Sequence, residues 1–79
     1  MGLSVSIIAY DGIEPIDIGA TYGVLSMARR IAPGISMHVA APARDVVMAQ
    51  GLRLMADHSL DEAPTADVVL VLGGPGWVN

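Results

Sequence analysis

One segment carries most of the fold information in this chain: Ala66-Asp67-Val68-Val69-Leu70-Val71-Leu72-Gly73-Gly74-Pro75-Gly76. Its five consecutive aliphatic residues, 68–72, show no period-2 alternation, which predicts a strand buried on both faces of a parallel sheet. The run stops in a Gly-Gly-Pro-Gly turn, where glycine permits positive φ and close approach of a ligand to main-chain N–H groups. Ligands of open α/β sheets bind outside the carboxyl ends of the strands. We therefore expect the turn at 73–76 to border a site.

The segments before this strand predict a βαβ unit. Residues 3–9 and 35–41 alternate in polarity and predict two strands. Between them, Pro15 suits the first turn of a helix, and Ala32-Pro33-Gly34 ends that helix. The residues expected to pack on the sheet recur at helical spacing. They are Ile16, Ala20, Gly23, Val24, Met27 and Ile31.

Two smaller elements are expected between the second strand and residue 66. The runs 45–49 and 52–56 flank Gln50-Gly51, a two-residue loop that favours a β-hairpin. The segment 59–62 (Ser-Leu-Asp-Glu) fits a capping box and predicts a short helix, which Pro64 ends after about one turn.

These elements predict an α/β fold with a mostly parallel, flavodoxin-like sheet, composed of a βαβ unit, a hairpin and a buried central strand. A sheet that ended on its most buried strand would leave that strand's edge unpaired and its faces half covered. We therefore expect residues 1–79 to form the N-terminal portion of a single larger domain.

Composition excludes several classes of function. The chain has 79 residues, 53% of them hydrophobic, and no cysteine, so these residues hold neither disulfides nor thiolate metal sites. A net charge of −4 with no lysine argues against nucleic-acid binding by this segment. No apolar run approaches the roughly 18–20 residues of a membrane span, and the start of the chain lacks the basic residues of a signal peptide. We expect a cytoplasmic protein that does not contact a membrane.

No cofactor or metal ion is expected either. The 73–76 turn lacks the Lys-Ser/Thr of a P-loop, and the turn at 10–14 lacks the spaced glycines of a dinucleotide-binding loop. His38 lies within an apolar strand and suggests a packed structural residue, and His58 suggests a loop or capping residue. Two histidines without a third ligand make a poor metal site.

An acidic group follows the first strand. Asp11 before Gly12 is typical of a turn, and Glu14 near the helix start can compensate the helix dipole. Asp17, between Ile16 and Ile18, either plays the same dipole role or is a functional carboxyl that donates a hydrogen bond or proton. In a parallel sheet this turn and the glycine turn share one edge, so Asp17 and Gly73–Gly76 are expected to face one site.

The segments 7–20, 51–60 and 67–76, taken together and in this order, resemble the DJ-1/PfpI (ThiJ) superfamily. The resemblance is to its isonitrile-hydratase-like branch and to the amidase-like domains of AraC-type regulators. It implies a flavodoxin-like homodimer that acts on a small-molecule substrate with a cysteine nucleophile on a strand-to-helix elbow. That cysteine would lie beyond residue 79.

The resemblance also implies roles for individual residues. Asp17 corresponds to the acidic residue that hydrogen-bonds the nucleophilic sulfur, and Gly74 to a glycine whose N–H contributes to the oxyanion hole. Substrate contacts are expected from Glu14, Gly73 and Gly76. Water addition to an isonitrile is the first activity expected for the parent protein, with amide or glyoxal-type chemistry next. The alternatives are a ligand-sensing domain of an AraC-type regulator, and a non-catalytic fragment or assembly partner.

Overall fold

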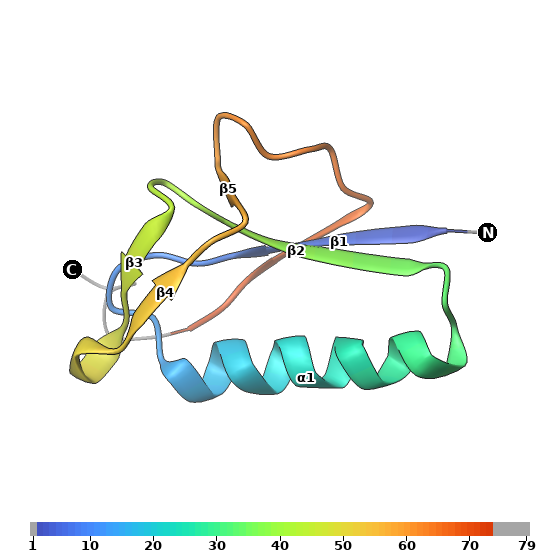
Figure 1. The fold of residues 1–79 in the computed structure, drawn as a ribbon, viewed down its shortest axis with the longest axis horizontal. Helices are drawn as coiled ribbons and strands as arrows, with labels where there is room; N and C mark the ends of the chain where they lie inside the picture. Colours follow the sequence, from blue (N-terminus) through green and yellow to red (C-terminus); the bar gives the residue numbers. More distant parts are fainter. Residues whose placement is uncertain (1, 74–79) are drawn as a thin grey trace.

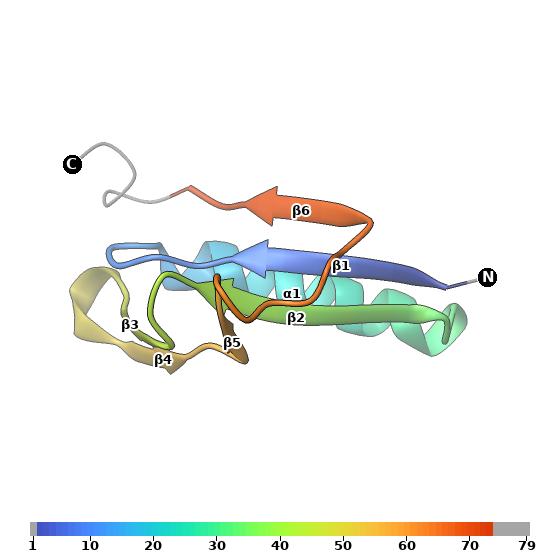
Figure 2. The ribbon, with the colours of Figure 1, turned by 90° about the horizontal axis from the view of Figure 1, so that it is seen from above.

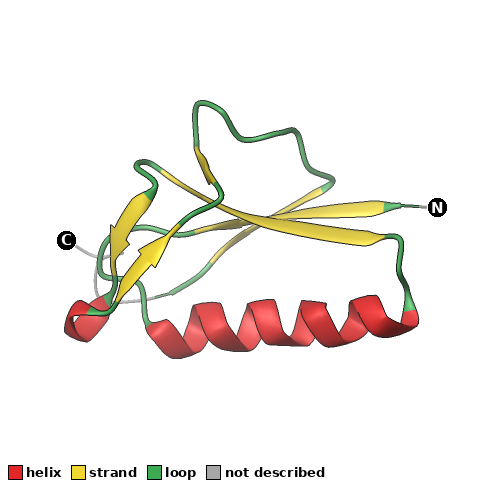
Figure 3. Ribbon diagram, in the orientation of Figure 1, coloured by secondary structure: helices red, strands yellow, loops and turns green. Residues whose placement is uncertain are grey.

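The computed structural model describes residues 2–73 as a small sheet with one long helix beneath it (Figure 1). Strands alternate with the helix in the first half of the chain, and short strands follow in the second half (Figure 3). The elements are β1 (Leu3–Ile8), α1 (Pro15–Ile31), β2 (Ile35–Ala41), β3 (Asp45–Val47), the 3₁₀ turn η1 (Ala49–Gly51), β4 (Arg53–Met55), β5 (His58–Ser59) and β6 (Val68–Val71).

The main sheet has the strand order β5-β2-β1-β6, and all three pairings are parallel. Figure 2 shows β1 running between β2 and β6, with α1 on the far side of the sheet in that view. This arrangement confirms the predicted α/β fold with a mostly parallel sheet and a βαβ unit formed by β1, α1 and β2. Its core consists of Val5, Ile7, Ala9, Ile13, Ile18, Val39, Ala41, Val46, Met48 and Ala56.

Helix α1 has the predicted bounds, but its predicted packing face is wrong. Ile18 is 7% exposed and lies in the core, and Leu25 packs against that core. Most of the predicted stripe is not packed on the sheet: Ile16 is 74% exposed and Ile31 89%, whereas Ala20 and Val24 border an open cavity with Leu70 of β6. At 3.6 residues per turn, Ile16 and Ile18 lie about 200° apart around the helix. The helix therefore carries two apolar sides, and helical spacing alone does not show which one meets the sheet.

The hairpin is confirmed as a separate antiparallel pair, β3 with β4. The loop has three residues, Ala49–Gly51, because Val47 pairs with Arg53 and the Met48 N–H donates to the Leu52 carbonyl oxygen at 2.7 Å, so the predicted two-residue loop is wrong. It places Gln50 at φ 66° and Gly51 at φ 88°. The glycine supplies this conformation without strain, and the turn fixes the register that buries Val46.

The short helix predicted at 59–62 is wrong: Ser59 ends a short strand and residues 60–62 form a turn. The two side chains of the predicted capping box contact each other directly, since Ser59 Oγ donates to Glu62 Oε1 at 3.0 Å, and neither side chain caps a helix. His58 and Ser59 instead pair with Ala40 and Ala41 as the edge strand β5, which the sequence analysis missed. Pairing with the sheet satisfies backbone groups that a single helical turn ended by Pro64 would leave open.

Strand β6 confirms the strand predicted in the opening segment, but among residues 2–73 it is neither central nor buried on both faces, contrary to the prediction. It pairs with β1 at the sheet edge, and within residues 2–73 its outer side carries no partner strand. Val69 is 58% exposed and Val71 52%, whereas Leu70 packs against the core. Within residues 2–73, no helix is long and apolar enough to cross a membrane.

Candidate functional site

The candidate site lies where β1 and β6 end. Because the two strands are parallel and Ile8 pairs with Val71, the turn after β1 and the segment after β6 leave the sheet at the same edge. Figure 2 shows both arrows pointing toward that edge, where α1 also begins. The structure thus brings the Asp17 turn of α1 and Gly73 together, as the sequence analysis expected.

The register of β6 is fixed at its other end by Asp67. Asp67 Oδ2 accepts hydrogen bonds from the Ser4 backbone N–H at 2.8 Å and from Ser4 Oγ at 3.2 Å. The Asp67 backbone N–H in turn lies 3.1 Å from Ser4 Oγ and 3.0 Å from the Ser4 carbonyl oxygen. This reciprocal contact starts β6 in the register that sets Leu70 beside Ile7.

Asp17 and Gly73 approach each other closely at this edge. A Cβ added at Gly73 would lie 3.6 Å from Asp17 Oδ2, an ordinary van der Waals contact. Asp17 is half-buried in the first turn of α1, and Gly73 is exposed. Gly73 does not have a positive φ, so its backbone conformation does not require glycine. The absent side chain matters instead because it leaves the space beside the Asp17 carboxylate open.

Two other acidic residues of the turn, Asp11 and Glu14, contact backbone groups of neighbouring segments. Asp11 Oδ1 accepts the Val47 N–H at 3.0 Å, which ties the turn to the hairpin and fits the turn role expected for Asp11. Glu14 is the N-cap residue of α1, but its side chain makes no capping hydrogen bond. Its backbone N–H points to the Gly73 carbonyl oxygen at 3.5 Å, a long contact. Glu14 therefore borders the site, and substrate binding by it stays a prediction.

The sequence analysis missed Tyr10, which also belongs to this edge. Tyr10 Oη donates to the Leu72 carbonyl oxygen at 2.5 Å, joining the end of β1 to the segment after β6. Burial, and secondarily the negative charge of Asp17, raises the pKa of Tyr10 above its ordinary value of 10.0. The hydroxyl is therefore protonated at neutral pH and able to donate. A tyrosine directly after a buried strand, at the edge where the carboxyl ends meet, was the available signal.

The remaining predicted glycines, Gly74 and Gly76, lie outside the described residues. Their expected roles in the oxyanion hole and in substrate binding stay predictions.

The two histidines lie elsewhere, on β2 and β5. The ring centroids of His38 and His58 are 5.4 Å apart, in an edge-to-face arrangement. In the described part of the chain, His38 Nε2 is buried without a hydrogen-bond partner. No group of three or more potential metal ligands occurs among residues 2–73.

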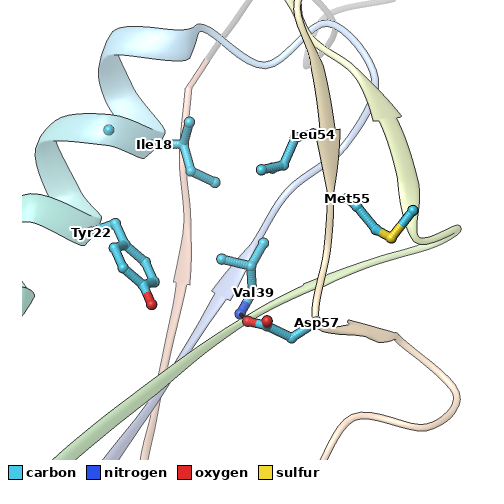
Figure 4. A pocket seen from close by; sticks show the side chains of 7 residues that line it. Ile18, Tyr22, Val39, Leu54, Met55 and Asp57 are labelled. Carbon is cyan, nitrogen blue, oxygen red and sulfur yellow. Dashed lines mark hydrogen bonds between the residues drawn. The ribbon is translucent and has the colours of Figure 1, made fainter.

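A cavity of about 320 Å³ lies on the helix side of the sheet, between α1, β2 and the hairpin (Figure 4). It is mainly apolar, and Ile18, Tyr22, Val39 and Leu54 are among its lining residues. Asp57 also lines it, but its Oδ2 accepts the Val39 N–H at 2.8 Å and so has a structural role. Asp17 and Gly73 do not line this cavity, which is therefore separate from the candidate site.

Several solved structures share the architecture of this chain. Toxoplasma gondii DJ-1 in its oxidised form matches 95% of the chain with a TM-score of 0.79 and 23% identity. A mutant of a DJ-1 superfamily protein from Salmonella typhimurium matches 94% of it, with a TM-score of 0.65 and 25% identity. The chain has the DJ-1 fold. An AraC family transcriptional regulator from Pseudomonas putida shares that fold over 91% of the chain, with a TM-score of 0.76 and 21% identity.

These matches cover only part of the DJ-1-like structures. The chain spans 40% of the Toxoplasma and Salmonella chains and 47% of the Pseudomonas regulator. No protein-family model and no curated protein matches the sequence. The resemblance noted in the sequence is thus confirmed for the DJ-1 fold, which the three neighbours share.

Proposed function

We propose that residues 1–79 are the N-terminal portion of a single DJ-1/PfpI-like domain, and that the complete protein is a cysteine-dependent enzyme acting on a small molecule. The observation that carries this proposal is the Asp17 carboxylate beside the open backbone at Gly73, at the carboxyl edge of a parallel sheet. The exposed side chains of Val69 and Val71 support further chain covering β6. The proposed site of action is the cytoplasm, and no cofactor is proposed.

The first proposed reaction is hydration of an isonitrile to an N-formamide. A cysteine thiol from outside these residues would add to the terminal isonitrile carbon, giving a thioimidate as the carbon gains a proton. Water would then add to that carbon, and the thiol would leave with its proton restored, releasing the N-formamide. Asp17 would donate and recover the transferred proton, and the Gly74 N–H would stabilise negative charge that develops on the adduct.

Purified full-length protein incubated with an alkyl isonitrile tests this reaction, with the N-formamide detected by NMR. Asp17→Asn is expected to lower kcat/KM by about 10²–10⁴-fold, the range for loss of a general acid–base. Asp61→Asn is the matched control, because Asp61 is exposed in the loop before β6 and distant in sequence from this edge. Full activity in Asp17→Asn, or turnover by the isolated 79-residue chain, would contradict the proposal.

A second candidate is a ligand-sensing domain of an AraC-type regulator, which the Pseudomonas neighbour favours. It predicts a basic DNA-binding domain elsewhere in the full-length protein and operator binding that changes with a small molecule. Electrophoretic mobility shifts with the full-length protein distinguish it from the enzyme. A non-catalytic assembly partner, the third candidate, would show neither turnover nor DNA binding.

The proposed assembly of the complete protein is a homodimer. The outer apolar side of α1, which includes Ile16, Met27 and Ile31, offers surface that a second copy would bury. Met27→Glu is expected to shift the sedimentation coefficient toward that of a monomer.

A further inference from the structure

Among residues 2–73, two hydrogen bonds link the segment after β6 to the turn after β1, and they differ in length. The Glu14 N–H reaches the Gly73 carbonyl oxygen at 3.5 Å, which is near the limit of a hydrogen bond. The Tyr10 hydroxyl reaches the Leu72 carbonyl oxygen at 2.5 Å. Tyr10 therefore supplies the strong link between the two segments that form the candidate site.

The hydrogen bond from Tyr10 fixes the backbone immediately before Gly73. Leu72 precedes Gly73 directly, and Gly73 borders Asp17 Oδ2. Strand β6 is an edge strand of the described sheet, so past Val71 the ladder with β1 no longer fixes the chain. The tyrosine side chain is partly buried and packs against the core, which anchors its hydroxyl to the rigid part of the fold.

We propose that Tyr10 is a positioning residue of this site: by donating to the Leu72 carbonyl, it holds the backbone at Gly73 against the Asp17 carboxylate. The catalytic importance of this positioning rests on the proposed function. The hydrogen bond between Tyr10 and the Leu72 carbonyl does not depend on it. Tyr10 transfers no proton in this scheme: a tyrosine hydroxyl is protonated at neutral pH, and burial, followed by the charge of Asp17, raises the pKa of Tyr10 further.

The first test requires no substrate. Tyrosinate formation in full-length protein is followed by ultraviolet absorbance during alkaline titration, and the Tyr10→Phe difference curve isolates Tyr10. Asp17→Asn is expected to lower the titration midpoint of Tyr10, because the negative charge that opposes tyrosinate is removed. An unchanged midpoint would show that the two side chains are not adjacent in solution, and would overturn the proposal.

The second test separates positioning from a purely structural role. Tyr10→Phe is expected to lower kcat for isonitrile hydration by on the order of tenfold to a hundredfold, since small misplacements of reacting groups have effects of this size. KM is expected to change little. Tyr22→Phe is the matched control, because Tyr22 lies on α1 at the separate cavity. Wild-type kcat in folded Tyr10→Phe protein would overturn the proposal.

The two proposals fail separately. If the wild-type protein hydrates no isonitrile, the proposed reaction is wrong, and the Tyr10 midpoint in Asp17→Asn still decides whether Tyr10 and Asp17 lie together at this edge. If the wild-type protein is active and Tyr10→Phe keeps its kcat, the reaction stands and the positioning role is wrong.

Discussion

Removing the Asp67 carboxylate is expected to destabilise the fold at the point where β6 joins the sheet. Asp67→Ala eliminates the hydrogen bonds that Asp67 Oδ2 accepts from Ser4 N–H and Ser4 Oγ. Both are exposed, so we assign each about 0.5–1 kcal/mol, the lower part of the usual range. The expected loss in free energy of unfolding is about 1–2 kcal/mol. Backbone pairing of Asp67 with Ser4 remains, which limits the loss.

The loss bears on the site because the Ser4–Asp67 contact sets the register. A slip of β6 by one residue would move Gly73 by about 3.3 Å along the strand and turn Leu70 away from the core. The Ser4–Asp67 contact lies at the start of β6 and Gly73 lies just past its end. By fixing the register of the strand, the contact keeps Gly73 beside Asp17.

Urea denaturation of the full-length protein measures this loss, with Asp61→Ala as a control of equal charge change. The Ser4→Ala and Asp67→Ala double-mutant cycle is expected to give a coupling energy of at least about 0.5 kcal/mol. The reasoning is refuted if Asp67→Ala destabilises no more than Asp61→Ala, or if the two changes are additive.

Three further outcomes are expected. Ile18→Ala should lower the free energy of unfolding by about 2–4 kcal/mol, whereas Ile16→Ala should change it by less than about 0.5 kcal/mol in the monomer; equal losses would contradict the observed helix face. Because the folded-state pKa of Tyr10 is raised, its stabilising effect is present below pH 10.0 and is lost as the pH rises through the folded-state value. Urea midpoints measured across that alkaline range should therefore fall less steeply in Tyr10→Phe than in wild type. Gly73→Ala should keep or raise stability, by up to about 1 kcal/mol, yet lower kcat/KM roughly tenfold, because its methyl group would occupy the space beside Asp17; unchanged kinetics would show that this space is not used.

Periodicity and turn chemistry were sufficient for most of the fold. A run of aliphatic residues, a proline at the helix start and the Gln50-Gly51 turn each act locally, so the bounds of α1 and β2 and the presence of the hairpin follow from short segments. The packing face of α1 could not be found in this way, because its two apolar sides satisfy the same helical period. Strand β5 was missed because two residues that pair with β2 leave no periodic pattern.

The site could be predicted only where topology alone brings residues together. Parallel strands bring Asp17 and Gly73 to one edge, and this needs no side-chain detail. Tyr10 could not be assigned, because its role depends on a hydroxyl that reaches a carbonyl sixty-two positions away in the chain. Such a contact depends on the register of β6 on β1, which the sequence implies only through Asp67 and Ser4.

The central claim is that the edge formed by Asp17, Tyr10 and Gly73 is half of a cysteine-dependent site. The most direct test is a crystal structure of the full-length protein at neutral pH. The account predicts a cysteine Sγ within hydrogen-bond distance of the Asp17 carboxylate, with the Tyr10 hydroxyl still bound to the Leu72 carbonyl. A full-length structure in which no thiol reaches Asp17 would contradict it.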